Sequence, residues 1–141
     1  MLQHTQKTTT SDLIENFSLF DDWEDRYRYL IDLGKDLPPM EEALKIPAHK
    51  VEGCTSQVWM VMQKDEREDE DAFIFLADSD AHIVRGLIAI LMAAYYGQPK
   101  SEIASIDVES LFRSLGLDQH LSPNRRNGFF SMVEKIRASA A

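Results

Sequence analysis

Two short apolar runs separated by a charged spacer constrain the fold of this chain more than any other feature. The runs are residues 58–62 (VWMVM) and 72–77 (AFIFLA), and the spacer is residues 63–71 (QKDEREDED). Short apolar runs rich in valine, isoleucine and aromatic residues are typical of buried strands, and a highly charged spacer is typical of a solvated loop. We therefore expect an antiparallel hairpin, with a third, edge strand at residues 49–52.

The segments before the hairpin have helical spacing of their apolar residues. Residues 11–20 form one such segment, and residues 21–37 form a second that ends at Pro38. Asp21 is expected to cap the second helix, since a carboxylate before a helical run accepts the first free backbone N–H groups. The polar segment 1–10 is expected to be a disordered arm.

The segments after the hairpin are also helical. Residues 78–97 start with the potential cap residues Asp78, Ser79 and Asp80 and are apolar on most faces, which predicts a core helix packed across the sheet. A short helix near residues 101–106, one capped by Asp107 and one capped by Ser122 follow. The pattern predicts an α+β fold, a small antiparallel sheet of about three strands flanked by helices.

Length and charge limit the class of protein. A chain of 141 residues is expected to form one domain, here residues 11–141. A net charge of −9 argues against nucleic acid as a partner and suits docking onto a basic patch of another protein. The most apolar segment, residues 83–96, is too short to span a bilayer and contains Arg85. With one cysteine and no recognisable secretion signal, we expect a cytoplasmic protein with a reduced thiol.

The single cysteine, Cys54, is a candidate metal ligand. Structural zinc takes four nitrogen or sulfur ligands, and cysteine-ligated clusters generally take four thiolates. The four histidines are scattered along the chain, so a mixed site of Cys54, Asp78 and His120 is the arrangement that remains. We expect neither a metal nor a cofactor.

Thiol chemistry is the alternative use of Cys54. Its flanks, EGCTSQ, match neither the papain nor the caspase pattern. Gly53 permits an unusual backbone conformation and a close approach by a partner, and residues 55–57 supply hydroxyl and amide groups. Two readings remain open on the residues alone, an inert buried cysteine and a thiolate that carries a sulfur atom as a persulfide.

Several motifs in the same order resemble the SufE family of sulfur acceptors. They are WEDRYRYLIDLGKDLP (23–38), GCTSQVW (53–59), DSDAHIVRGLIAIL (78–91) and LSPNRRNGFFSM (121–132). The resemblance extends from about Leu13 to Ala138. It implies the SufE/IscU-like fold and a partner, a SufS-type cysteine desulfurase, that uses pyridoxal phosphate to hold sulfur from L-cysteine as a persulfide. The acceptor cysteine, Cys54 here, would take that sulfur, activate the desulfurase and pass the sulfur to an iron–sulfur scaffold.

The resemblance also implies roles for the residues around Cys54. Gly53, Ser56 and Gln57 would shape the cysteine loop, which we expect to pack inward and swing out on the desulfurase, with Gly53 in the hinge. Partner contact is one reading for Asp78 and for Arg125. The other is that Asp78 caps the long helix and that Arg125 is a solvated residue of a first helical turn. Trp59 and His120 are expected to be structural.

Other functions and partners stay open at this point. A CsdE-like acceptor for a second desulfurase, CsdA, fits the same motifs. A scaffold of the IscU type is disfavoured, because those proteins use three cysteines. A desulfurase-binding adaptor with an incidental cysteine and a single-cysteine redox sensor are further alternatives. The sequence also leaves a homodimer open.

Overall fold

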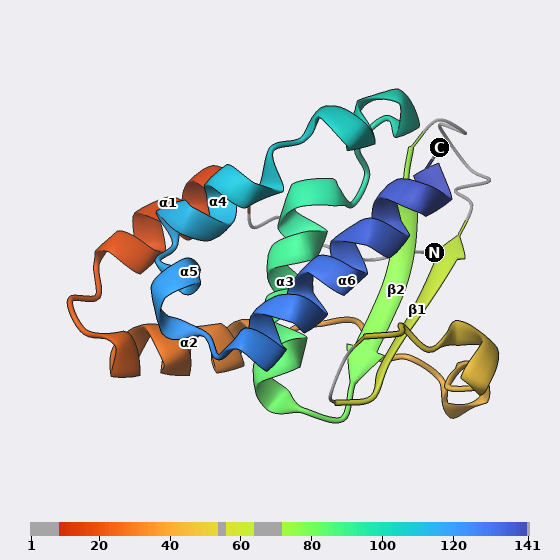
Figure 1. Cartoon of the computed structure of the whole chain (residues 1–141), viewed down its shortest axis with the longest axis horizontal. Helices are drawn as coiled ribbons and strands as arrows, with labels where there is room; N and C mark the ends of the chain where they lie inside the picture. The colour runs from red at the N-terminus through yellow and green to blue at the C-terminus, as the bar shows by residue number, and fades with distance from the viewer. Residues whose placement is uncertain (1–8, 54–55, 64–71, 141) are drawn as a thin grey trace.

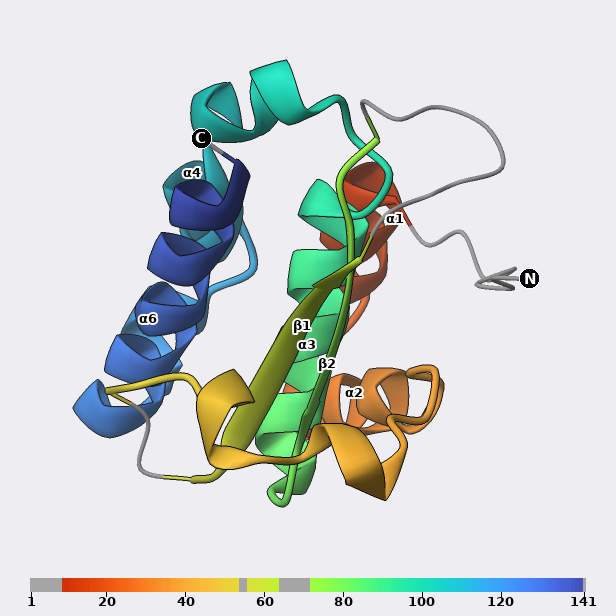
Figure 2. The same cartoon turned by 90° about the vertical axis from the view of Figure 1, so that its right-hand side faces the viewer.

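The fold places a two-stranded hairpin against a central helix. The computed structural model describes residues 9–53, 56–63 and 72–140. Its elements, in chain order, are α1 (Thr10–Ser18), α2 (Trp23–Lys35), the 3-10 helices η1 (Glu42–Leu44) and η2 (Pro47–His49), β1 (Val58–Gln63), β2 (Ile74–Ser79), α3 (His82–Tyr95), the 3-10 helix η3 (Lys100–Ser105), α4 (Val108–Ser114), α5 (Leu117–His120) and α6 (Pro123–Ala140). Figures 1 and 2 show α3 alongside the hairpin, and α2 and α6 lie on different sides of α3.

The predicted hairpin is present and antiparallel. Its register runs from Val58 opposite Ser79 to Gln63 opposite Ile74. The predicted third strand is reduced to one isolated bridge between Lys50 and Trp59, so the described sheet has two strands. The reason is local, because a 3-10 helix ends at His49 and a turn begins just after Val51, which leaves too little extended chain for a strand. The predicted acidic loop, residues 64–71, lies outside the described residues.

Helix α3 forms the centre of the core. Ten of its fourteen residues are buried, which confirms the prediction of a core helix. It packs closely against α2, because a Cβ at Gly86 would overlap the backbone carbonyl of Leu30, and a Cβ at Gly34 would lie 2.7 Å from the backbone nitrogen of Gly86. Glycine at both positions therefore sets the short distance between the two helices.

The helix caps agree with the sequence in part. Asp107 caps α4, and Ser122 accepts a hydrogen bond from the Arg125 amide (3.2 Å) just before Pro123 begins α6, both as predicted. Helix α2 is capped by Asp22 rather than Asp21.

The start of α3 differs from the prediction. Its N-cap is Ala81, whose amide donates to the Ser79 hydroxyl (3.1 Å), and no side chain caps the helix directly. The reason is that β2 continues through Ser79, so two of the three predicted cap residues belong to the strand. At the other end of the chain, residues 1–8 lie outside the described part, Thr9 caps α1 and Thr10 begins it.

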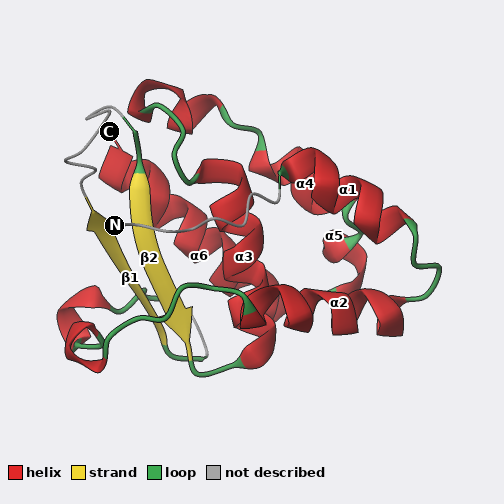
Figure 3. Ribbon diagram, turned by 180° about the vertical axis from the view of Figure 1, so that it is seen from behind, coloured by secondary structure: helices red, strands yellow, loops and turns green. Residues whose placement is uncertain are grey.

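The two ends of the molecule differ in character. Figure 3 shows both strands together at one end and α1, α2, α4 and α5 toward the other. Among the described residues, no helix is both long enough and apolar enough to cross a membrane.

Candidate functional site

The site predicted around Cys54 is a turn that leads into β1. Cys54 itself and Thr55 lie outside the described residues, so the flanking residues Gly53, Ser56 and Gln57 define the site. We refer to residues 52–57 as the cysteine turn. Gly53 and Ser56 both lie against helix α6, and Gln57 binds Asp80 at the end of the hairpin, so these contacts show how the turn is held.

Gly53 is held against helix α6. Its φ of 88° lies in the left-handed region, which side chains other than glycine rarely adopt. A Cβ built on Gly53 would lie 2.5 Å from the hydroxyl oxygen of Ser131, so that hydroxyl would have to rotate away. The conformation favours glycine at this position, and the close approach adds to that preference.

Ser56 is bound by the first turn of α6. The Arg125 guanidinium donates a hydrogen bond to the Ser56 hydroxyl at 3.2 Å, and both residues are half-buried. Because Ser122 and Pro123 fix the start of α6, they also fix the position of Arg125 beside the turn. The structure thus brings Arg125 to the predicted site and places a positive charge there.

Gln57 is bound by Asp80, a residue that the sequence predicts only as a helix cap. The Asp80 carboxylate accepts from the Gln57 backbone amide (3.2 Å) and from its side-chain amide (3.5 Å), and the Asp80 amide donates to the Gln57 carbonyl (3.3 Å). Both residues are exposed. The hairpin register is the signal that could have revealed this pair, because Val58 lies opposite Ser79 and the next two residues outward are Gln57 and Asp80.

A small apolar pocket adjoins Ser56 and Arg125. It lies between the start of β1, α3 and the first half of α6, and its volume of about 20 Å³ is enough for one water-sized group. The lining residues are Ser56, Val58, Val84, Leu87, Asn124, Arg125, Gly128, Phe129 and Met132. Most of this lining is hydrocarbon, so the pocket suits a soft, weakly hydrated atom such as sulfur.

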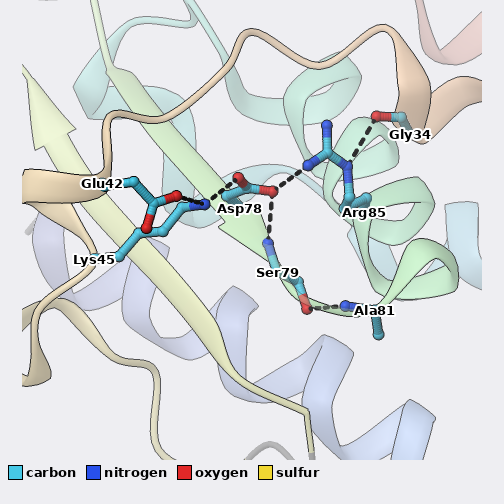
Figure 4. A network of polar contacts seen from close by, with 7 residues as sticks. All are labelled: Gly34, Glu42, Lys45, Asp78, Ser79, Ala81 and Arg85. Carbon is cyan, nitrogen blue, oxygen red and sulfur yellow. Dashed lines mark hydrogen bonds and ion pairs between the residues drawn. The ribbon is translucent and has the colours of Figure 1, made fainter.

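Asp78 lies in a different polar network. Figure 4 shows its carboxylate between two cations, with Arg85 at 2.6 Å and Lys45 at 3.3 Å. Asp78 is 4% exposed, and its carboxylate also accepts from the Ser79 amide at 2.8 Å. The structure therefore places Asp78 in the interior, linking β2 to α3 and to the segment after η1. Its carboxylate does not cap α3.

The same network extends to two other segments. Arg85 also donates to the Gly34 carbonyl at the end of α2 (3.3 Å). Hydrogen bonding to Glu42, followed by that to Asp78, raises the pKa of Lys45 above its ordinary value despite partial burial. The Lys45 ammonium lies 5.5 Å from the centre of the Trp59 ring, which is itself almost buried in β1. Trp59 thus has the structural position that the sequence indicated.

The mixed metal site that the sequence left open gains no support from these contacts. Asp78 is paired with two cations, and His120 stacks on Trp23 with the ring centres 4.6 Å apart. Within the described ranges, no group of three or more histidine, cysteine, aspartate or glutamate side chains is placed to hold a metal ion.

Comparisons with known proteins identify the family. Residues 11–140 match the SufE family, described as the Fe-S metabolism associated domain. An uncharacterised SufE-like protein of Rhizobium etli is 50% identical over 128 residues, which cover 91% of this chain and 86% of the relative. A second, of Rhizobium meliloti, is 45% identical over 133 residues, 94% of this chain and 95% of the relative.

A solved structure shows the same fold. The solution structure of a hypothetical protein from Thermus thermophilus superposes with a TM-score of 0.73 at 15% identity, covering 95% of this chain and 94% of that one. The family match over nearly the whole chain, together with relatives of this identity and coverage, shows that the protein belongs to the SufE family, whose domain is associated with iron–sulfur metabolism.

Proposed function

We propose that this protein is a sulfur acceptor and activator of a SufS-type cysteine desulfurase, and that Cys54 carries the sulfur to an iron–sulfur scaffold. The observation that carries the proposal is a lone cysteine followed closely by two residues, Ser56 and Gln57, that are held by separate polar contacts, in a chain of the SufE family. Pyridoxal phosphate would belong to the desulfurase. We propose a cytoplasm-like compartment, since the reaction needs a reduced thiol.

The proposed transfer is a thiol–disulfide type exchange. The Cys54 thiolate attacks the terminal sulfur of the persulfide on the desulfurase cysteine. One sulfur–sulfur bond forms on Cys54 as the other breaks, and the desulfurase cysteine leaves as a thiolate. The sum of the oxidation states does not change, so no external oxidant or reductant is needed. Delivery to the scaffold repeats the exchange with Cys54 as the donor.

The contacts around the cysteine turn support a carrier that shields its sulfur. A persulfide open to solvent would be lost to any passing thiol, so protection before docking is a chemical requirement. The Arg125–Ser56 and Asp80–Gln57 contacts hold the turn to the body of the protein, and a pocket of about 20 Å³ adjoins it. We propose that docking of the desulfurase breaks these contacts and releases the turn about Gly53.

Intact mass measurement tests the proposal directly. The protein is incubated with a purified SufS-type desulfurase, pyridoxal phosphate and L-cysteine, and Cys54→Ser serves as the control. We expect a mass gain of one sulfur atom on the wild-type chain, a loss of that gain on reduction and no gain in the variant. Desulfurase stimulation without a mass gain would instead identify an adaptor with an incidental cysteine. If both effects were absent with every desulfurase of the organism, CsdA-type enzymes included, the carrier function would be refuted.

A further inference from the structure

Apolar side chains are exposed at the connection between α1 and α2, far from the cysteine turn. Of the large apolar side chains in the described residues, four are exposed, and three of them lie within fourteen positions of one another: Ile14, Leu19 and Tyr27. Leu19 is 73% exposed, the highest value of the four. Ile14 lies on α1, Tyr27 lies on α2, and Leu19 lies in the connection itself. Isolated exposed apolar residues are normal, but a group of them is typical of a protein-binding surface.

The spacing on α1 shows which side of the helix faces solvent. Leu13 and Phe17 are buried, whereas Ile14, Glu15 and Leu19 are exposed. By helical spacing, Glu15 and Leu19 lie on the side away from the buried pair, and Ile14 lies at the edge between the two sides. Asp21 follows in the connection and is exposed as well. We call the surface made by Ile14, Glu15, Leu19 and Asp21 the tip surface.

The acidic charge of the described chain is concentrated in the same region. Residues 9–45 contain ten acidic and four basic side chains, a net charge of −6, whereas the other described residues contain eight of each. The nearby arginines are already included in this sum. Arg26 donates to the backbone carbonyls of Phe20 and Leu115, and Arg28 pairs with Asp25, so neither forms an ion pair with Glu15 or Asp21.

Within the described part of the chain, the carboxylates of the tip surface have no cationic partner of their own. The ion pairs among these residues include neither Glu15 nor Asp21. An exposed leucine between such carboxylates matches a partner that offers an apolar recess rimmed by lysine or arginine.

The tip surface is rigid enough to bind without a large ordering penalty. Tyr29 holds the end of α1, because its hydroxyl binds the Asn16 side-chain amide (2.8 Å) and its ring packs on Phe17 and Phe20. The start of α1 has a capping box between Thr9 and Asp12. Preformed surfaces of this kind bind with less loss of conformational entropy than loose ones.

The position of the tip surface indicates which partner it serves. Figures 1 and 3 show the α1–α2 connection at one end of the long axis, with β1 and β2 toward the other end. A sulfur donor must cover the cysteine turn that leads into β1, and the α1–α2 connection lies at the other end of the long axis, away from that turn. A recipient protein could therefore be held at the tip while the turn is being loaded.

From these observations we infer that the tip surface is a docking site for the sulfur-receiving scaffold, which binds it through an apolar recess with a basic rim. This inference rests on the proposed carrier function but assigns a surface that the transfer chemistry does not require. The inference makes two claims that the proposed carrier function does not make. Scaffold binding depends on Leu19 and on the carboxylates beside it, and desulfurase binding does not.

A matched pair of variants tests the inference. The test variant combines Leu19→Ser with Asp21→Lys, and the control combines Ala104→Ser with Glu102→Lys on the exposed helix η3. Both change one exposed apolar residue and reverse one charge, and none of the four side chains is buried. Binding of the full-length chains to the purified scaffold complex and, separately, to the purified desulfurase is measured by calorimetry at low and physiological salt.

We expect the test variant to bind the scaffold at least about tenfold more weakly, as for loss of an interface anchor, with a smaller difference at higher salt. The control should bind both proteins like wild type, and the test variant should still gain sulfur from the desulfurase. Unchanged scaffold binding would overturn the inference, as would an equal loss of desulfurase binding. Failure of the carrier function has a different signature, namely no sulfur on wild-type Cys54.

Discussion

Replacing Gly53 with alanine measures how tightly the cysteine turn is held against α6. At a φ of 88°, a residue with a side chain costs about 1–2 kcal/mol more than glycine. The new Cβ would also lie 2.5 Å from the Ser131 hydroxyl oxygen, and because that hydroxyl can rotate, overpacking adds about 1 kcal/mol, the low end of its usual range. We therefore expect Gly53→Ala to lower the free energy of unfolding by about 2–3 kcal/mol.

The chain offers a control that separates these two contributions. Gly97 has a nearly equal φ of 81°, but nothing lies within 4 Å of the Cβ that alanine would add there. Gly97→Ala should therefore lose only the backbone contribution of about 1–2 kcal/mol. Ser131→Ala removes the overlapping oxygen and leaves the Ser131 Cβ at 3.4 Å, an ordinary contact. The double variant Gly53→Ala/Ser131→Ala should then be about as stable as Gly97→Ala.

Urea denaturation of the wild type and the four variants gives the required free energies. A change in the midpoint at constant slope reports stability alone, and the double-mutant cycle reports the coupling between positions 53 and 131. Equal losses for Gly53→Ala and Gly97→Ala, with no rescue by Ser131→Ala, would show that Ser131 does not press on the turn. The account of how the turn is held against α6 would then be wrong.

Three further predictions concern charged groups. Asp78→Asn should lower stability by about 3 kcal/mol in chemical denaturation, because it leaves two partly buried cations without their carboxylate. A hydrogen bond from Arg137 lowers the pKa of Glu109, so this pair stabilises the fold above the ordinary carboxyl pKa and loses its effect as the pH falls through the lowered value. Glu109→Gln should therefore cost up to about 1 kcal/mol at neutral pH and become indistinguishable from wild type in strongly acidic denaturation series. Arg125→Ala should increase the alkylation rate of the single thiol several-fold, and Arg113→Ala, which changes an exposed arginine on α4, should leave that rate unchanged.

The hairpin and the core helix could be predicted because their signals are local. The runs at 58–62 and 72–77 are short, apolar and separated by a charged spacer, and residues 78–97 are apolar on most faces with glycine at the end. Each pattern constrains a single element, and the structure confirms both elements. The prediction of an edge strand at residues 49–52 was wrong for a reason that is also local. Pro47 favours the 3-10 helix η2, which leaves little extended chain before the turn.

Cap residues were harder to place than the helices they precede. Asp78, Ser79 and Asp80 all suit an N-cap, and the pattern cannot tell where a strand ends and a helix begins when two elements are adjacent. The structure uses each residue differently. Asp78 pairs with two partly buried cations, and the Ser79 hydroxyl accepts a hydrogen bond from the amide of Ala81, the N-cap of α3. Asp80 binds Gln57 in the cysteine turn.

Contacts between distant segments explain what the sequence could not show of the site. Asp78 meets Lys45 and Arg85 because the segment after η1, β2 and α3 come together, and no local pattern encodes that meeting. Arg125 reaches Ser56 across 69 positions of the chain. The family resemblance identified both Asp78 and Arg125 as notable, but only the fold shows that one is interior and the other lies beside the turn.

The strengths of these contacts fit a turn that opens on demand. The four hydrogen bonds that hold the turn are at least partly exposed to water, and each is worth about 0.5–1.5 kcal/mol, so opening would require about 2–6 kcal/mol. The open form would then be populated at roughly one part in thirty to one part in twenty-five thousand, and a partner that binds only that form must supply this energy on docking. Asp78, two residues before Asp80, is buried, and its ion pairs are much more costly to break. Asp80 therefore keeps its position when the turn moves away from it. A rigid base with weak contacts above it is what the proposed carrier requires, because the turn can release its sulfur without unfolding the hairpin that presents it.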